Sequence, residues 1–201
     1  MTINVGIYLY GDVEVLDFAG PFEVFSTASR VKARLDPDSD DLFNVFTVGE
    51  TMAAIHARGG LQVVPKYTVT EHPSIHLLII PGGIVTAELE KPRVVEWIAA
   101  CSEKTEITAS VCTGAFLLAK AGLLSAMRAT THWEDIQDLR TMFPDLDVLS
   151  DVRWVDEGHV VTSAGISAGI GMSLHLVSRL ANADLAIRTA RQMEFDWKRD
   201  D

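Results

Sequence analysis

Residues 107–122, ITASVCTGAFLLAKAG, decide the fold, because an apolar strand-like run ends at Cys112 and an apolar helical pattern begins at once. Such a tight bend directs the cysteine side chain outward above the carboxyl end of a sheet, where open α/β folds place their chemistry. The first N–H groups of the following helix lack partners and the helix dipole is positive there, so we expect thiolate to be favoured over thiol. The sequence therefore predicts a nucleophile at a strand-to-helix elbow. A buried structural cysteine is the alternative.

The composition is that of a globular protein with one domain. The chain has 201 residues, of which 48% are hydrophobic and 22% are charged, and this length suits a single domain over residues 1–201. The net charge of −11 disfavours sequence-independent binding to nucleic acid, which needs clustered Lys and Arg. No basic leader precedes an apolar core, and no window approaches the roughly 20 apolar residues of a membrane span. We expect a cytoplasmic protein with neither a nucleic-acid nor a membrane partner.

The two cysteines do not indicate a metal site. Cys101 and Cys112 cannot form a disulfide framework, and without histidines at ligand spacing two sulfurs make a poor zinc site. Cys101 falls in line with Val94 and Ile98 at helical spacing, which core packing explains. The late glycines, at positions 165, 169 and 171, have the wrong spacing for a dinucleotide-binding loop. We expect no metal and no cofactor.

Strand-like and helical patterns alternate along the chain. This order predicts parallel strands joined by crossover helices, hence a three-layer α/β sandwich with a mostly parallel sheet. A charged run at 32–41 is expected to form an exposed loop. The expected strands are 4–10, 43–48, 61–64, 76–80, 107–111 and 129–131, with a hairpin around Glu157 and Gly158; the expected helices are 21–31, 92–101, 113–121 and 133–143, and the chain is helical from 168 onward.

Asp17 is the second candidate for chemistry. It lies just beyond the first expected strand and just before Pro21, which suits the first turn of a helix at the same sheet edge as Cys112. The apolar neighbours Val15, Leu16 and Phe18 would partly desolvate the carboxylate, raise its pKa and make it a proton carrier or a partner for a thiolate. Helix capping is the alternative role.

A glycine turn, Pro81-Gly82-Gly83, follows the expected strand 76–80 and ends at the same edge. Its amides are unobstructed by side chains and can hold an anion. We expect the N–H of Gly83 and the amide of Thr113 to form an oxyanion hole for charge that develops on a substrate. The alternative is a turn without a binding role.

Two further positions are expected near the cleft. His132 would lie at a strand end immediately before a helix, where it donates a hydrogen bond to substrate, orients another group, or serves a structural role at the helix N-terminus. Ile166 lies in the small, flexible stretch 164–169 and is expected to form one wall of the pocket. The other five histidines show no ligand spacing and are interpreted as surface or packing residues: His56, His72, His76, His159 and His175.

Taken as a set, five segments resemble the ThiJ/PfpI superfamily: LDFAGPFEVF at 16–25, IIPGG at 79–83, SVCTGAFLLAKAGLL at 110–124, RATTHW at 128–133 and TSAGISAGIGMSL at 162–174. The resemblance covers nearly the whole chain. It implies a flavodoxin-like fold of the class I glutamine amidotransferase type. Within the superfamily the chain is similar to isocyanide hydratases and to the ligand-domain half of AraC-type regulators.

The resemblance also implies residue roles. Cys112 corresponds to the elbow nucleophile and Asp17 to the catalytic aspartate of the hydratases, and Thr113 contributes its amide, with its hydroxyl as a further candidate. In hydratases of this kind the thiolate attacks the isocyanide carbon and a covalent thioimidate forms. The aspartate protonates carbon and then activates water, and an N-substituted formamide leaves. We therefore expect a hydratase that acts on a small carbon–nitrogen substrate.

Two departures narrow the resemblance. Protease-like members have histidine directly after the cysteine, where this chain has Thr113, which weakens a peptidase or glyoxalase interpretation. AraC-type regulators continue into a DNA-binding module, whereas this sequence ends at Asp201, so we expect no DNA-reading half. The alternatives to an enzyme are a non-catalytic oxidative-stress or small-molecule sensor in which Cys112 is oxidised, and a ligand-binding domain without turnover. Superfamily members commonly form homodimers, and we expect one here.

Overall fold

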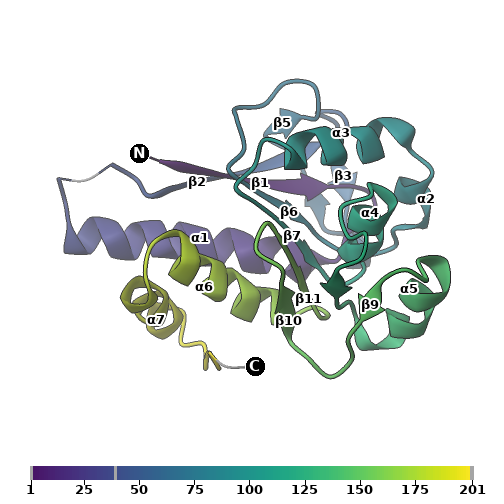
Figure 1. Ribbon diagram of the computed structural model, residues 1–201. Helices are drawn as coiled ribbons and strands as arrows, with labels where there is room; N and C mark the ends of the chain where they lie inside the picture. The colour runs from purple at the N-terminus through teal and green to yellow at the C-terminus, as the bar shows by residue number, and fades with distance from the viewer. Residues whose placement is uncertain (1, 39, 200–201) are drawn as a thin grey trace.

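The computed structural model describes residues 2–38 and 40–199, and its centre is a seven-stranded sheet in the order β10-β11-β7-β6-β1-β2-β5 (Figure 1). Every pairing in this sheet is parallel except that of β10 with β11. The strands are β1 (Ile3–Leu9), β2 (Phe43–Gly49), β5 (Tyr67–Thr68), β6 (Leu77–Ile80), β7 (Ile107–Val111), β10 (Trp154–Asp156) and β11 (Val160–Ser163).

Helices cover both faces of this sheet (Figure 1). On one face α1 (Val15–Leu35), α6 (Ala168–Leu180) and α7 (Ala183–Gln192) pack against one another. On the other face α2 (Thr86–Leu89), α3 (Pro92–Ser102) and α4 (Gly114–Lys120) form a second layer. These features confirm the predicted three-layer α/β sandwich with a mostly parallel sheet.

The central strands are buried because both of their faces are covered. All four residues of β6 and all five of β7 are buried, and β6 reads LLII with no exposed side chain. Continuous apolar runs of this kind are typical of parallel strands between two helical layers. The two strands run side by side with Ile80 opposite Ser110, so the turns that follow them lie at the same edge.

Smaller elements surround this carboxyl edge. Helix α5 (Ile136–Met142) follows the 3-10 turn η2 (Trp133–Asp135). Two separate two-stranded sheets pair β3 (Ile55–His56) with β4 (Gln62–Val63), and β8 (Arg128–Ala129) with β9 (Asp147–Val148). The short 3-10 turn η1 (Arg58–Gly60) separates β3 from β4. Within the described part of the chain, no helix combines the length and the apolar character needed to cross a membrane.

The structure differs from the expected elements in several places. The C-terminal part, expected to be helical from 168 onward, is helical only as far as Gln192, and residues 193–199 form no helix. Helix α1 begins at Val15 and contains Pro21, whereas a start at Pro21 was expected. The proline removes one helix hydrogen bond, and the packing of this buried turn against the core offsets that loss. The expected loop at 32–41 contains the last turn of α1, which ends at Leu35. The segments 61–64 and 129–131 contribute strands to the small sheets and not to the central one. The hairpin around Glu157 and Gly158 is confirmed.

Candidate active site

The chain makes a sharp bend between β7 and α4, as the sequence predicts. Cys112 has a φ of 56°, in the left-handed region that non-glycine residues seldom adopt and that often marks functional sites. Gly114 makes the bend possible, because a Cβ at that position would lie 2.1 Å from the carbonyl oxygen of Ile80. The nucleophile-elbow geometry therefore depends on a close approach of α4 to the end of β6.

Cys112 is largely buried, with 7% of its surface exposed, but it lines a cavity of about 410 Å³. A small molecule in this cavity reaches the sulfur without a change in the fold. The other lining residues are Glu14, Arg58, Gly83, Thr113, His132, Glu134, Asp135 and Ile166.

The thiol of Cys112 is held in its neutral form. Burial raises its pKa to about 12, and the negative charge of Asp17 adds to this rise. Hydrogen bonds from the backbone amides of Thr113 and Ile166 to the sulfur lower the pKa, but by less. The expectation of a resting thiolate is therefore wrong, because desolvation outweighs the helix amides on which that expectation was based.

Asp17 is fully buried in the first turn of α1. Its Oδ2 accepts a hydrogen bond of 3.0 Å from the N–H of Gly82, and its Oδ1 has no hydrogen-bond partner among the described residues. Burial raises the pKa of Asp17 from an ordinary value of 3.8 to about 7, although the Gly82 amide and the Cys112 thiol lower it. The predicted desolvated carboxyl group is confirmed. The capping alternative is not, since the N-cap of α1 is Glu14.

Asp17 and Cys112 form a coupled acid pair. Hydrogen bonding with the thiol lowers the pKa of the carboxyl group, and the carboxylate charge raises the pKa of the thiol. Near neutral pH the thiol keeps its proton while Asp17 exchanges one, and the two titrations belong to the pair. A proton can therefore pass from sulfur to Asp17 when the sulfur attacks a substrate.

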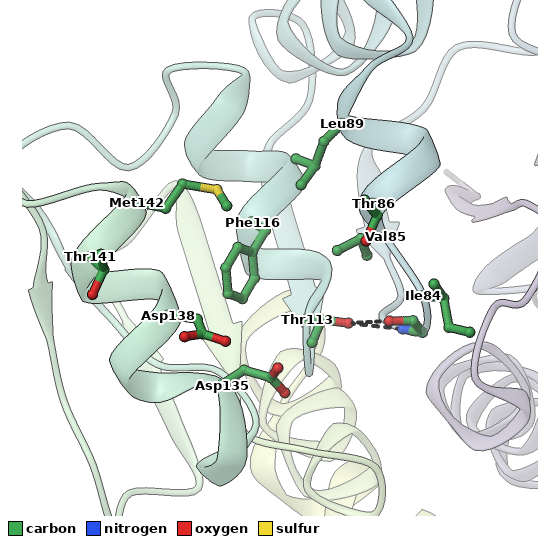
Figure 2. Close-up of a pocket in the computed structure, with 11 residues that line it drawn as sticks. Ile84, Val85, Thr86, Leu89, Thr113, Phe116, Asp135, Asp138, Thr141 and Met142 are labelled. Carbon is green, nitrogen blue, oxygen red and sulfur yellow. Dashed lines mark hydrogen bonds between the residues drawn. The ribbon is translucent and has the colours of Figure 1, made fainter.

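The glycine turn has a different role from the expected one. Thr113 Oγ1 accepts the N–H of Gly83 and donates to the carbonyl oxygen of Gly83, each at 2.9 Å, as the dashed lines in Figure 2 show. The N–H of Gly82 donates to Asp17. The expected oxyanion hole containing the Gly83 amide is therefore not formed, because the Thr113 hydroxyl occupies that amide. The amides directed at the sulfur belong to Thr113 and Ile166.

The turn at Gly82 leaves no room for a side chain. A Cβ at this position would lie 2.6 Å from the backbone N of Thr113 and 2.9 Å from Asp17 Oδ2. The hydroxyl of the buried Tyr10 donates to the carbonyl oxygen of Pro81 at 3.1 Å and holds the preceding residue of the turn. Glycine at position 82 therefore allows Asp17 to come within hydrogen-bond distance of this backbone.

His132 lines the cavity and also caps a helical turn. Its Nδ1 accepts the N–H of Glu134 at 3.4 Å and lies 3.4 Å from Asp135 Oδ2. Gly165 packs directly against the ring, since a Cβ there would lie 1.9 Å from His132 Cδ2. The structure thus combines the expected position near the cleft with the structural role that was its alternative. None of the other five histidines lines the Cys112 cavity.

Ile166 forms part of the cavity wall, as the sequence predicts. Its φ of 48° is unusual for a β-branched residue and indicates local strain. This backbone conformation accompanies the hydrogen bond from its amide to the Cys112 sulfur.

Sequence reasoning missed several residues of the cavity. Arg58 and Glu14 form an ion pair of 3.3 Å at its wall, and no local pattern connects them with Cys112. Glu134 and Asp135 directly follow His132, and that adjacency was the one available signal. Within residues 2–38 and 40–199, no group of three or more His, Cys, Asp or Glu side chains is arranged to hold a metal ion.

Comparisons with known proteins agree with the geometry. The model of the DJ-1/PfpI family matches residues 4–179. The isonitrile hydratase of Pseudomonas putida is 30% identical over 196 residues, which cover 97% of this chain and 79% of that protein. The transcriptional regulator CdhR of Pseudomonas aeruginosa is 27% identical over 96% of this chain, which spans only 55% of the regulator.

Solved structures share the fold. A ThiJ/PfpI family protein from Pseudomonas syringae superposes with a TM-score of 0.84 at 24% identity and covers 98% of this chain and 77% of its own. DJ-1beta of Drosophila melanogaster superposes with a TM-score of 0.81 at 17% identity, over 98% of this chain and 100% of its own. The resemblance that the sequence motifs indicated is confirmed.

Proposed function

The chain belongs to the DJ-1/PfpI family, and on that premise we propose that it is a cysteine-dependent hydratase of the isocyanide hydratase type. It adds water to an isocyanide and releases an N-substituted formamide. Similarity to the isonitrile hydratase of Pseudomonas putida supports this reaction class. The observation that carries the proposal is the fully buried carboxyl group of Asp17 beside the Cys112 thiol, with one oxygen free of any described partner.

The first step forms a carbon–sulfur bond. The Cys112 sulfur attacks the terminal carbon of the isocyanide while its proton passes to the Asp17 carboxylate. Asp17 then delivers that proton to the same carbon, which gives a neutral thioimidate on Cys112. A pKa of about 7 for Asp17 suits both transfers, because a group that titrates near the working pH accepts and donates protons readily.

The second step breaks this bond. Asp17, again ionised, accepts a proton from water as the water oxygen attacks the thioimidate carbon, and it passes that proton to the substrate nitrogen. The tetrahedral intermediate collapses to a formamide as its hydroxyl group gives up its proton to Asp17, and Asp17 returns this proton to the departing Cys112 sulfur. The two hydrogens of water end on nitrogen and sulfur, and the original thiol hydrogen ends on carbon, so the cycle balances without a redox partner.

The second candidate function for Cys112 is that of an oxidation sensor. Peroxide reacts with accessible thiolates, and burial together with the charge of Asp17 raises the pKa of Cys112 to about 12. A resting thiol is a poor sensor. The hydratase needs no resting thiolate, because Asp17 removes the proton during attack. Asp17 can accept the thiol proton in either reaction, so the turnover of isocyanide separates the enzyme from the sensor.

The test is hydration of methyl, cyclohexyl and n-hexyl isocyanide by the purified protein, with the formamide measured by proton NMR. Cys112→Ala is expected to abolish turnover, and Asp17→Asn to lower it by about 10²–10⁴-fold, as for loss of a general acid–base group. Because Asp17 must be ionised to accept the thiol proton, kcat/KM is expected to rise with pH and to level off above about 7.

Cys101→Ala is the matched control, since Cys101 is also a buried cysteine but lines a separate cavity with His72 and Trp97. It is expected to keep wild-type activity. Nitriles, amides and methylglyoxal are assayed in parallel, and mass spectrometry of the intact protein follows adducts on Cys112. A folded wild-type protein that hydrates none of the isocyanides contradicts the proposal, and peroxide-sensitive Cys112 in that inert protein would favour the sensor.

A further inference from the structure

A second cavity of about 440 Å³ adjoins the one at Cys112. It lies between α2, α4 and α5, and Figure 2 shows side chains from these three elements directed into it. The two cavities share three lining residues, Gly83, Thr113 and Asp135. The two hydrogen bonds between Thr113 and Gly83, called the clamp below, and the Asp135 side chain therefore lie where the two cavities meet.

The walls of the second cavity are mainly apolar. Phe116 and Met142 lie across from Val85 and Leu89 (Figure 2). Ile84 and Met142 are 52% and 54% exposed, so two large apolar side chains at the cavity have about half of their surface uncovered by protein. The cavity over Cys112 is lined instead by charged and polar groups, with Ile166 as the apolar exception. An organic substituent attached to a carbon–nitrogen group at Cys112 finds its nearest apolar surface here.

One side of the second cavity is acidic. Asp135 and Asp138, from the start and the first turn of α5, both line it, and no Lys or Arg is among its described lining residues. Arg140, the cation of the same helix, donates to the carbonyl oxygen of Val148 at 2.7 and 3.2 Å. Among the described residues, His132 is the one basic side chain at ion-pair distance from Asp135, with its Nδ1 3.4 Å from Asp135 Oδ2, and Asp138 has none.

We propose that the second cavity receives the organic substituent of the substrate and that Asp135 and Asp138 make the enzyme discriminate between substituents by charge. Substituents that end in an ammonium group are favoured, apolar ends are accepted, and carboxylate ends are rejected. This inference rests on the proposed function, and it adds a substrate class to it: isocyanides with an apolar chain and a neutral or cationic end.

The experiment compares three isocyanides of equal chain length that end in a methyl, an ammonium or a carboxylate group. We expect kcat/KM for the carboxylate to be about tenfold or more below that for the methyl compound, and the ammonium compound to equal or exceed the methyl compound, as for a single unscreened charge contact near a surface. A second series changes chain length. Met142→Trp narrows the cavity and is expected to lower kcat/KM about tenfold more for n-hexyl than for methyl isocyanide.

The variant Asp135→Asn/Asp138→Asn removes both charges without a large change in volume. It is expected to bring the three rates within about threefold of one another, since the charge contact is gone. Asp145→Asn, an exposed aspartate of the loop after α5 that lines neither cavity, is the matched control and should keep the wild-type order. Equal rates for methyl and carboxylate ends in the wild type, or an order unchanged in the double variant, overturns the inference.

A binding measurement separates this inference from the proposed function. Calorimetry with n-hexylammonium and hexanoate, which cannot be hydrated, tests the cavity even when no isocyanide is turned over. Binding of n-hexylammonium that weakens in Asp135→Asn/Asp138→Asn and in Met142→Trp supports the cavity whatever the outcome of the turnover assay. If isocyanides are hydrated but hexanoate binds as tightly as n-hexylammonium, the charge selection is wrong and the hydratase assignment stands.

Discussion

Replacing Asp17 by asparagine is expected to stabilise the protein at neutral and alkaline pH while it abolishes most of the activity. The carboxyl group is fully buried, and its pKa rises from an ordinary 3.8 to about 7. Asparagine has nearly the same shape, can still accept the N–H of Gly82, and carries no charge to desolvate. The variant therefore separates the energetic penalty of a buried ionised group from its use in catalysis.

The magnitude follows from linkage between protonation and folding. Between about pH 4 and about pH 7 the unfolded chain has lost the Asp17 proton while the folded protein retains it, so wild-type stability falls as the pH rises through this window. At 1.36 kcal/mol per pKa unit, a shift of roughly 3 units destabilises the folded state by about 4 kcal/mol above pH 7. Between about pH 5 and about pH 8 the unfolding free energy of the wild type falls by about 3 kcal/mol through this group, and that of Asp17→Asn does not.

The assay is urea unfolding of the wild type and Asp17→Asn at several pH values across this range. The quantity used is the change with pH of the difference in unfolding free energy between the wild type and Asp17→Asn, because pH-independent effects of the substitution cancel in it. Asp145→Asn, an exposed aspartate, is the control, and its unfolding free energy is expected to run parallel to that of the wild type. A difference between wild type and Asp17→Asn that stays constant from about pH 5 to about pH 8 would refute the reasoning, because the carboxyl group would then not be desolvated.

Two further substitutions test the turn that holds Asp17. Gly82→Ala brings a methyl group within 2.6 Å of the Thr113 backbone N and 2.9 Å of Asp17 Oδ2, so stability is expected to fall by about 1–3 kcal/mol and hydratase activity to drop with it. Gly11→Ala, with nothing within 4 Å of the added Cβ, is its control, and equal effects on activity at the two positions would speak against a packed turn. Thr113→Val deletes the hydroxyl that bonds both the N–H and the carbonyl of Gly83, and we expect a loss of about 1–3 kcal/mol from the unsatisfied groups in thermal and urea unfolding. Thr113→Ser keeps the hydroxyl and should lose less; a valine variant as stable as the serine variant would mean that the clamp contributes nothing.

The main elements of the fold follow from local patterns. Runs without charged residues, such as LLII in β6 and ITASV in β7, predict strands that helices cover on both faces. The boundaries of helices and strands were harder to predict. Helix α1 begins six residues before Pro21, since burial against the core compensates for the proline, and burial depends on packing partners far away in the sequence.

The candidate site also combines features that are local in the sequence with contacts that exist only in the folded chain. The bend at Cys112 and the first-turn position of Asp17 are local features, and both occur where the residue order indicated. The Arg58–Glu14 pair at the cavity had no local signal, because the 3-10 turn η1 and the start of α1 meet only after the chain has folded. The clamp between Thr113 and Gly83 likewise requires the turns after β6 and β7 to lie side by side.

The sequence by itself determined that a cysteine stands at a strand-to-helix bend with an aspartate and a glycine turn at the same sheet edge, because strand and helix periodicities are local properties of the chain. The apolar neighbours of Asp17 in the sequence already indicated its raised pKa, but only the tertiary structure decided the protonation of Cys112. Helix amides alone would favour a thiolate, whereas burial raises the pKa of Cys112 to about 12. Desolvation depends on everything packed around a group, and no stretch of sequence contains that information.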